Sequence, residues 1–198
     1  MNILLLGKPG SGKRIQGKLI TEELGYKPVI SIDIIKEEIE SGSDLGTELD
    51  DIVNNGNLIS NRTMNKLINK YLFKVGFEDN SNGYVFDGYP RTIEQAEKIN
   101  KTLKLSKSKI DIVLFLEVDE ITLIERTLRT GEISGREDDQ HEDIILQRIK
   151  NYDKNTEPLK KYYEDKLHII DGNKSIGEVK ESIMDVIHQE ISKKYIAR

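Results

Sequence analysis

A glycine-rich run near the start of the chain has the composition and spacing of a phosphate-binding loop. Residues Gly7 to Lys13 read G-K-P-G-S-G-K, which fits the pattern G-x-x-x-x-G-K. In that pattern backbone N–H groups turn inward around phosphate oxygens, and the lysine adds positive charge near the terminal phosphates. The run lies between an apolar segment, Asn2 to Leu6, and an amphipathic one that begins at Lys13. Because this is the strand–loop–helix context that the motif requires, the sequence predicts a site for a nucleoside triphosphate.

A second polar run, Asp87 to Thr92, reads D-G-Y-P-R-T and follows another short apolar segment. In open α/β sheets ligands bind at the carboxyl ends of the strands, which makes Asp87 a candidate to hold Mg²⁺ through water. The guanidinium of Arg91 can hold a phosphate with two parallel hydrogen bonds. By itself this run also fits an ordinary turn, and the phosphate loop that precedes it favours the ligand-binding interpretation.

The apolar pattern of the chain predicts short buried strands that alternate with amphipathic helices. Strands are expected at residues 2–6, 29–31, 84–86, 110–116 and 168–170. Helices are expected at residues 13–24, 33–40, 45–54, 60–75, 92–103, 120–128, 142–154 and 176–191, with Thr156 and Pro158 starting a further one. We therefore expect an α/β fold: a P-loop three-layer sandwich with a five-stranded parallel sheet. Two segments do not fit the alternation and are expected to be inserts: the helical block 31–75 and a polar loop, 130–139, which contains Gly131 and Gly135.

Composition narrows the class of protein. A chain of 198 residues, 36% hydrophobic and 33% charged, is typical of a single globular domain with a highly charged surface. It has no cysteine, which excludes disulfides and cysteine-ligated zinc. The net charge of −5 argues against a nucleic-acid partner. The apolar run at the start is too short for a signal peptide or a membrane span, so we expect a cytoplasmic protein without a membrane partner.

Taken together and in this order, the two motifs resemble those of the adenylate kinase family of nucleoside monophosphate kinases. That family carries G-x-P-G-x-G-K near the N-terminus and D-G-F/Y-P-R-T after its third strand. Further segments fall where family segments fall, over nearly the whole chain: Ser41–Gly46, Gly56–Ile59, Ser134–Arg136, Thr156–Leu159 and Asp171–Gly172. The resemblance implies that block 31–75 is the monophosphate-binding region and that 130–139 is the lid over the donor. Only nine residues separate Arg126 from Arg136, which is typical of the short-lid form.

The resemblance also implies which residues form the site. Those expected to bind ATP are Gly10, Ser11, Gly12, Lys13, Arg14, Ile15, Arg126 and Lys174. Those expected to bind AMP are Ser31, Lys36, Asn57, Leu58, Ile59, Gly88, Arg91, Gln95, Arg136 and Arg148. The cations expected around the transferred phosphoryl group are Lys13, Arg91, Arg136 and Arg148, with Asp87 holding Mg²⁺ through water. In the family, the glutamine at position 95 marks an acceptor site that reads adenine.

Three positions depart from the family pattern. Arg14-Ile15 stands in place of Gly-Thr, Lys36 in place of an arginine, and Thr130 where a further lid arginine is expected. We hypothesise that Arg14 partly replaces the missing lid charge. The function that the resemblance implies is reversible phosphoryl transfer from ATP to AMP, giving two ADP, by a monomer. The alternatives are a kinase for UMP, CMP or another nucleoside monophosphate, and a catalytically impaired homologue that only binds nucleotides.

Overall fold

The structure, a computed structural model, describes residues 1–76, 83–134 and 139–196 of the chain. Its centre is a five-stranded sheet with the strand order β2-β3-β1-β4-β5. Every neighbouring pair of strands is parallel. The strands are β1 (Asn2–Leu6), β2 (Lys27–Ile30), β3 (Tyr84–Asp87), β4 (Ile110–Glu117) and β5 (Leu167–Asp171). The predicted five-stranded parallel sheet is thus confirmed.

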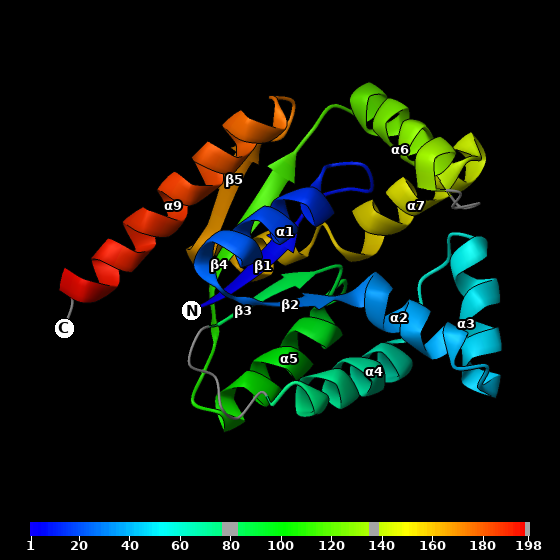
Figure 1. Ribbon diagram of the computed structural model, residues 1–198, viewed down its shortest axis with the longest axis horizontal. Coiled ribbons are helices and arrows are strands. Elements are labelled where there is room, and N and C mark those ends of the chain that lie inside the picture. The colour runs from blue at the N-terminus through cyan, green and yellow to red at the C-terminus, as the bar shows by residue number, and fades with distance from the viewer. Residues whose placement is uncertain (77–82, 135–138, 197–198) are drawn as a thin grey trace.

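Helices cover both faces of the sheet (Figure 1). They are α1 (Lys13–Leu24), α2 (Ser31–Glu40), α3 (Asp44–Asn54), α4 (Asn61–Lys74), α5 (Ile93–Leu105), α6 (Glu120–Ser134), α7 (Glu142–Asn155), α8 (Leu159–Tyr162) and α9 (Ile176–Ile196). A short 3₁₀ turn, Glu164–Lys166, leads into β5. The block formed by α2, α3 and α4 follows β2 without an intervening strand, as the sequence predicts for residues 31–75.

Successive side chains of a strand point to opposite faces of the sheet, and this separates two apolar cores. From β1, Leu4 and Leu6 join the core that α2, α4, α5 and α8 cover. Ile3 and Leu5 join the core that α1 and α9 cover. Because both faces of the sheet are covered, its central strands are apolar at nearly every position. The result is the expected three-layer arrangement.

The structure differs from the sequence prediction at several element boundaries. The polar segment that begins at Thr130 was expected to be a loop, but α6 continues through Ser134. Gly131 therefore lies in a helix; a Cβ there would lie 2.5 Å from the backbone oxygen of Asp139, so close packing rather than a turn requires the glycine. Ser31 begins α2 instead of ending β2. Thr156 is the residue after α7, and the helix that follows begins only at Leu159.

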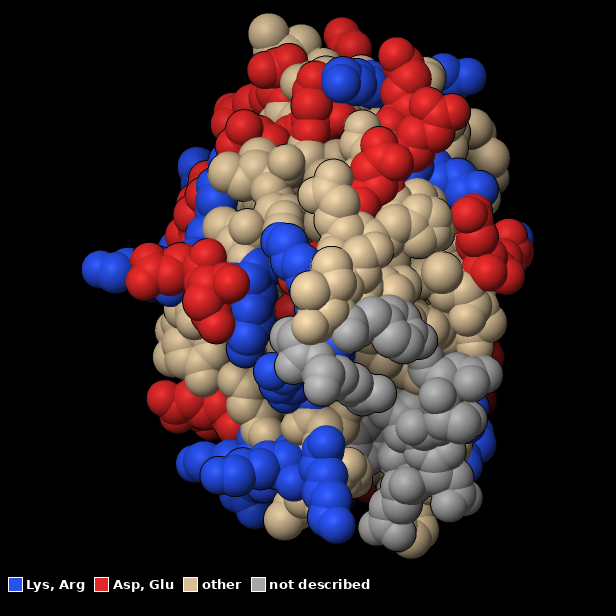
Figure 2. Space-filling view, turned by 90° about the vertical axis from the view of Figure 1, so that its left-hand side faces the viewer, with Lys and Arg blue, Asp and Glu red and all other residues tan. Residues whose placement is uncertain are grey.

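The surface carries charges of both signs. On the face seen in Figure 2, acidic side chains gather toward one end and basic side chains toward the other, so this face is not uniformly basic. Within the ranges that the structure describes, no helix has the length and apolar character needed to cross a membrane.

Candidate active site

The loop between β1 and α1 presents backbone donors at the carboxyl edge of the sheet. Gly12 precedes α1 with φ 87°, and because it has no side chain it leaves the first N–H groups of the helix uncapped. Gly10 has φ 81°, and a Cβ there would lie 2.5 Å from the carbonyl oxygen of Leu123. Both positions therefore require glycine. Free N–H groups at the positive end of a helix form a binding site for phosphate.

The ammonium group of Lys13 closes this loop on itself. Its Nζ donates to the carbonyl oxygens of Gly7, at 2.6 Å, and Lys8, at 2.9 Å, and to the hydroxyl of Ser11 at 3.2 Å. Burial lowers the pKa of Lys13 to about 8, and the positive charges of Arg91 and Arg148 add to the shift. The lysine thus lies near a site for anions, and a bound phosphate would favour its protonated form.

Asp87 ends β3 directly beside the phosphate loop. In the sheet it lies next to Leu5 of β1, and its side chain is buried. Burial raises the pKa of Asp87, whereas the nearby Lys13 and Arg91 favour its charged form. A carboxylate here fits Mg²⁺, which takes oxygen ligands and is usually held by one or two carboxylates with waters and substrate phosphates. The described residues contain no cluster of three or more His, Cys, Asp or Glu that would hold a metal by itself.

A pocket that is partly open to solvent adjoins the loop on the side of α2 and α4. It is lined by Ser31, Ile32, Ile35, Val53, Gly56, Asn57, Leu58, Ile59, Met64, Gly88, Arg91, Gln95 and Arg148. The structure therefore brings together most of the residues that the sequence assigns to AMP. Lys36 is the exception among those described, because it is exposed on α2 and does not line the pocket. Arg136 lies outside the described residues.

The floor of this pocket is tightly packed at Gly88. Its φ is 76°, and a Cβ there would lie 2.2 Å from the hydroxyl oxygen of the buried Ser31. Arg91, three residues further on, donates from its Nε to the Gly88 carbonyl oxygen at 2.9 Å. Glycine at this turn thus lets the start of α2 approach the end of β3, and the turn in turn orients the guanidinium.

Helix α7 closes the other side of the pocket. Arg148 projects from it and forms an ion pair with the buried Asp139. The amide of Asn151, one turn further along, donates to the carbonyl oxygen of Gly56 at 3.0 Å. Through these contacts α7 carries Arg148 to the mouth of the pocket and ties it to the loop between α3 and α4.

The residues predicted for the donor base lie on the opposite side of the phosphate loop. The guanidinium of Arg126 donates to the carbonyl oxygens of Gly172, at 2.8 Å, and Asn173, at 3.4 Å. Lys174 is exposed directly after them. This agrees with the expectation that Arg126 and the segment around Lys174 are neighbours, while their contact with a base remains a prediction.

The two unusual residues that follow the loop, in the first turn of α1, point outward. Arg14 pairs with Asp33 Oδ1, in the first turn of α2, at 2.7 Å, and Ile15 is 49% exposed. The structure thus gives Arg14 a partner that the sequence did not suggest. The hypothesis that Arg14 supplies a missing lid charge stays a prediction.

Sequence reasoning missed two contacts between α7 and the phosphate loop. The hydroxyl of Tyr152 accepts a hydrogen bond from the backbone N–H of Gly7 at 2.9 Å, and Asp153 pairs with Lys8 at 2.8 Å. Tyr152 lies four residues after Arg148, on the same helical face, and this spacing was a usable signal. Asp139, the partner of Arg148, lies in a polar segment without periodicity and offered none.

Lys13 of the loop lies within electrostatic reach of two cations that line the pocket, Arg91 and Arg148. The charges of Asp87, Arg91 and Arg148 affect the pKa of Lys13. Asp87 lies at the end of β3, Arg91 in the turn that follows it, and Arg148 in α7. Such a convergence at the carboxyl edge of a parallel sheet, next to a phosphate loop, defines a P-loop phosphotransferase for nucleotides.

Comparison with known proteins identifies the group within this class. The family model described as adenylate kinase matches residues 5–168. A protein named adenylate kinase from Azobacteroides pseudotrichonymphae is 38% identical over 189 residues, covering 94% of this chain and 97% of its own. Another of that name, from Methanothrix thermoacetophila, is 35% identical over 219 residues, covering 98% and 99%. A third, from Fervidobacterium nodosum, is 33% identical over 215 residues, covering 94% and 97%. The chain belongs to the adenylate kinase family.

Proposed function

We propose that this chain transfers a phosphoryl group reversibly from ATP to AMP, giving two ADP. The observation that carries the proposal is the proximity of two parts: the phosphate loop with Lys13, and the pocket lined by Arg91, Arg148 and Gln95, whose two cations act on the pKa of Lys13. A site of this kind holds two nucleotides with their phosphates facing each other. Because two polyanions repel, fixed cations must lie between them.

The reaction asks the protein chiefly for alignment and charge neutralisation. An oxygen of the AMP phosphate attacks the γ-phosphorus of ATP, and the bond from that phosphorus to the β,γ-bridging oxygen breaks. Amides of the loop and Lys13 would hold the phosphates of ATP. Arg91 and Arg148 would neutralise the charge of the transferred group, with Asp139 orienting the guanidinium of Arg148. A fixed donor aimed at charge that develops in the transition state is worth about 3 kcal/mol where water is excluded, as single oxyanion-hole donors show.

Mg²⁺ belongs to the proposal as a companion of ATP. Asp87 would hold it through water, and the ion would supply positive charge at the phosphate oxygens. The buried position of this carboxylate beside the phosphate loop supports the assignment.

AMP is the proposed acceptor because Gln95 lines the pocket. Its carboxamide can donate one hydrogen bond and accept another, which matches an edge of adenine. We further propose that the protein acts as a monomer in the cytoplasm; sedimentation of the purified chain and cell fractionation test these two points.

The decisive experiment measures nucleoside diphosphate formation from ATP and Mg²⁺ with AMP, UMP, CMP and GMP in turn. The proposal expects turnover with AMP that exceeds turnover with the pyrimidine nucleotides by at least tenfold. Preference for UMP or CMP would favour a different acceptor. Nucleotide binding without turnover would identify an impaired homologue.

A further inference from the structure

The amide of Gln95 is held in one orientation by a chain of hydrogen bonds that continues behind the pocket. Its Oε1 accepts from the backbone N–H of Arg91 at 2.8 Å, and its Nε2 donates to Asn61 Oδ1 at 3.0 Å. Asn61 in turn donates from Nδ2 to Glu94 Oε2 at 2.6 Å. Gln95 lines the pocket and is 3% exposed, whereas Asn61 and Glu94 are not among the lining residues.

The two ends of this chain fix its direction. A backbone N–H, here that of Arg91, can only donate, and a carboxylate, here that of Glu94, can only accept. If the amide of Gln95 turned over, its NH₂ group would face the N–H of Arg91, a conflict between two donors. A second conflict would follow, between the oxygens of Gln95 and Asn61. If Asn61 turned over as well, that second conflict would only move to the carboxylate of Glu94.

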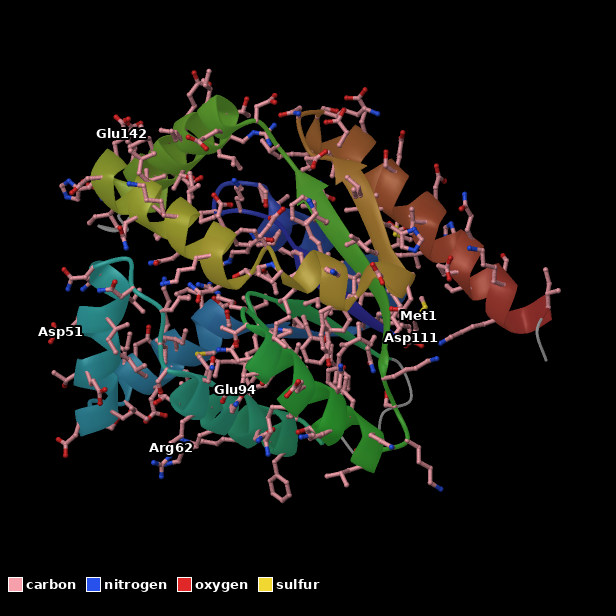
Figure 3. The ribbon with its side chains drawn as sticks, turned by 180° about the vertical axis from the view of Figure 1, so that it is seen from behind. Met1, Asp51, Arg62, Glu94, Asp111 and Glu142 are labelled. Carbon is pink, nitrogen blue, oxygen red and sulfur yellow. The ribbon has the colours of Figure 1, made fainter. Side chains whose placement is uncertain are left out.

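Further hydrogen bonds join the first turns of α4 and α5 at this point. Asn61 is the first residue of α4, and its Oδ1 also accepts from the hydroxyl of Thr92 at 2.9 Å. Thr92 is the N-cap of α5, and its hydroxyl oxygen accepts from the backbone N–H of Gln95. Glu94, labelled in Figure 3, lies in the first turn of α5 and accepts a hydrogen bond from Asn61 at the start of α4. The side chain of Asn61 thus connects the starts of α4 and α5 with the amide of Gln95 in one hydrogen-bond network.

We propose that Asn61 and Glu94 are positioning residues that make the acceptor site select a 6-amino purine over a 6-oxo purine. The inference rests on the proposed binding of AMP in this pocket. The Watson–Crick edge of adenine offers a donor at N6 and an acceptor at N1. Hypoxanthine, the base of IMP, offers an acceptor at O6 and a donor at N1. A carboxamide can match either base, but it needs opposite orientations for the two. The chain of hydrogen bonds through Asn61 and Glu94 holds Gln95 in one of these orientations.

The test compares AMP with IMP, because their bases differ only at this edge. Dissociation constants of both nucleotides are measured by calorimetry for the wild-type chain and its variants. The wild type is expected to bind AMP at least about tenfold more tightly than IMP, since two hydrogen bonds separate the ligands. In Asn61→Ala the ratio of the IMP dissociation constant to the AMP dissociation constant is expected to fall about fivefold or more. AMP should bind more weakly and IMP more tightly than in the wild type.

Three further variants make the result specific. Asn69→Ala removes another asparagine that links α4 to α5, through Thr102 at 3.4 Å, and should leave the ratio unchanged. Asn61→Asp combined with Glu94→Gln keeps an acceptor for Gln95 and a donor at position 94, and should restore the ratio. Glu94→Lys places a donor at the end of the chain, on an exposed residue, and should lower the ratio even if Asn61→Ala fails to fold.

An unchanged ratio in Asn61→Ala and in Glu94→Lys would overturn the inference, even if both nucleotides bound more weakly. A ratio that falls equally in Asn69→Ala would also overturn it, because the effect would then be general loosening. Binding does not require turnover, so these outcomes are separate from the fate of the proposed reaction. A wild-type chain that bound neither nucleotide would refute both.

Discussion

The hydrogen bond from the Gly7 amide to the Tyr152 hydroxyl, 2.9 Å long and buried, joins α7 to the first residue of the phosphate loop. Tyr152→Phe removes the acceptor and leaves a buried N–H without that partner, which costs about 1–3 kcal/mol. The midpoint of thermal unfolding should fall by about 2–4 °C for each kcal/mol in a chain of this size. Gly7 is the first residue of the loop that would hold ATP. If the variant loses about 1.4 kcal/mol of transition-state stabilisation at this loop, kcat/KM for ATP falls about tenfold.

Thermal unfolding and steady-state kinetics at saturating AMP measure the two effects. Tyr162→Phe is the matched control, because its hydroxyl accepts from Asn100 at 3.2 Å on the surface, away from the loop. That variant should keep the kinetics of the wild type and nearly all of its stability. The reasoning fails if Tyr152→Phe behaves like Tyr162→Phe in both measurements.

Three more predictions follow from the same cleft. The pKa of Lys13 is lowered to about 8, so the free enzyme loses this charge as pH rises through 8, and kcat/KM for ATP should decline about tenfold per pH unit above it. The value of kcat should decline only at higher pH, because bound phosphate favours the protonated lysine. A flat kcat/KM profile up to pH 10 would contradict this. Arg14→Gly should lower turnover or ATP affinity if Arg14 replaces a lid charge, and kinetics equal to the wild type would show that its pairing with Asp33 has no role in the reaction. Gly88→Ala forces a positive φ on alanine and drives its Cβ into Ser31, so the KM for AMP should rise at least about tenfold with a smaller effect on the KM for ATP, and an unchanged KM for AMP would remove Gly88 from the acceptor site.

The elements with a clear period were predictable from the sequence. The strand Asn2–Leu6 and the helix Lys13–Leu24 have the predicted bounds, because an apolar run and an amphipathic stripe leave few alternatives. The end of α6 was not predictable in the same way. Residues 130–134 are polar and include a glycine, yet they stay helical, with Gly131 packed against the backbone of Asp139. Local propensity gives no sign of such a contact.

The site shows the same division. The phosphate loop and Gly88 could be located from the sequence, because each depends on glycines within a few residues. Asn61, Asp139 and Tyr152 could not be assigned their partners, because each contact joins segments that are distant in the chain or lie in polar regions without a period. Tertiary packing sets these contacts, and packing is decided by the whole fold.

The central claim is that one cleft holds two nucleotides with their phosphates end to end. Calorimetric titration with a bisubstrate compound, two adenosines joined through five phosphates, tests it most directly. If the claim holds, one molecule binds per chain, at least about a hundredfold more tightly than ATP or AMP alone, because linking two ligands makes the second contact intramolecular. Two molecules bound per chain, or an affinity no better than that of ATP, would contradict it.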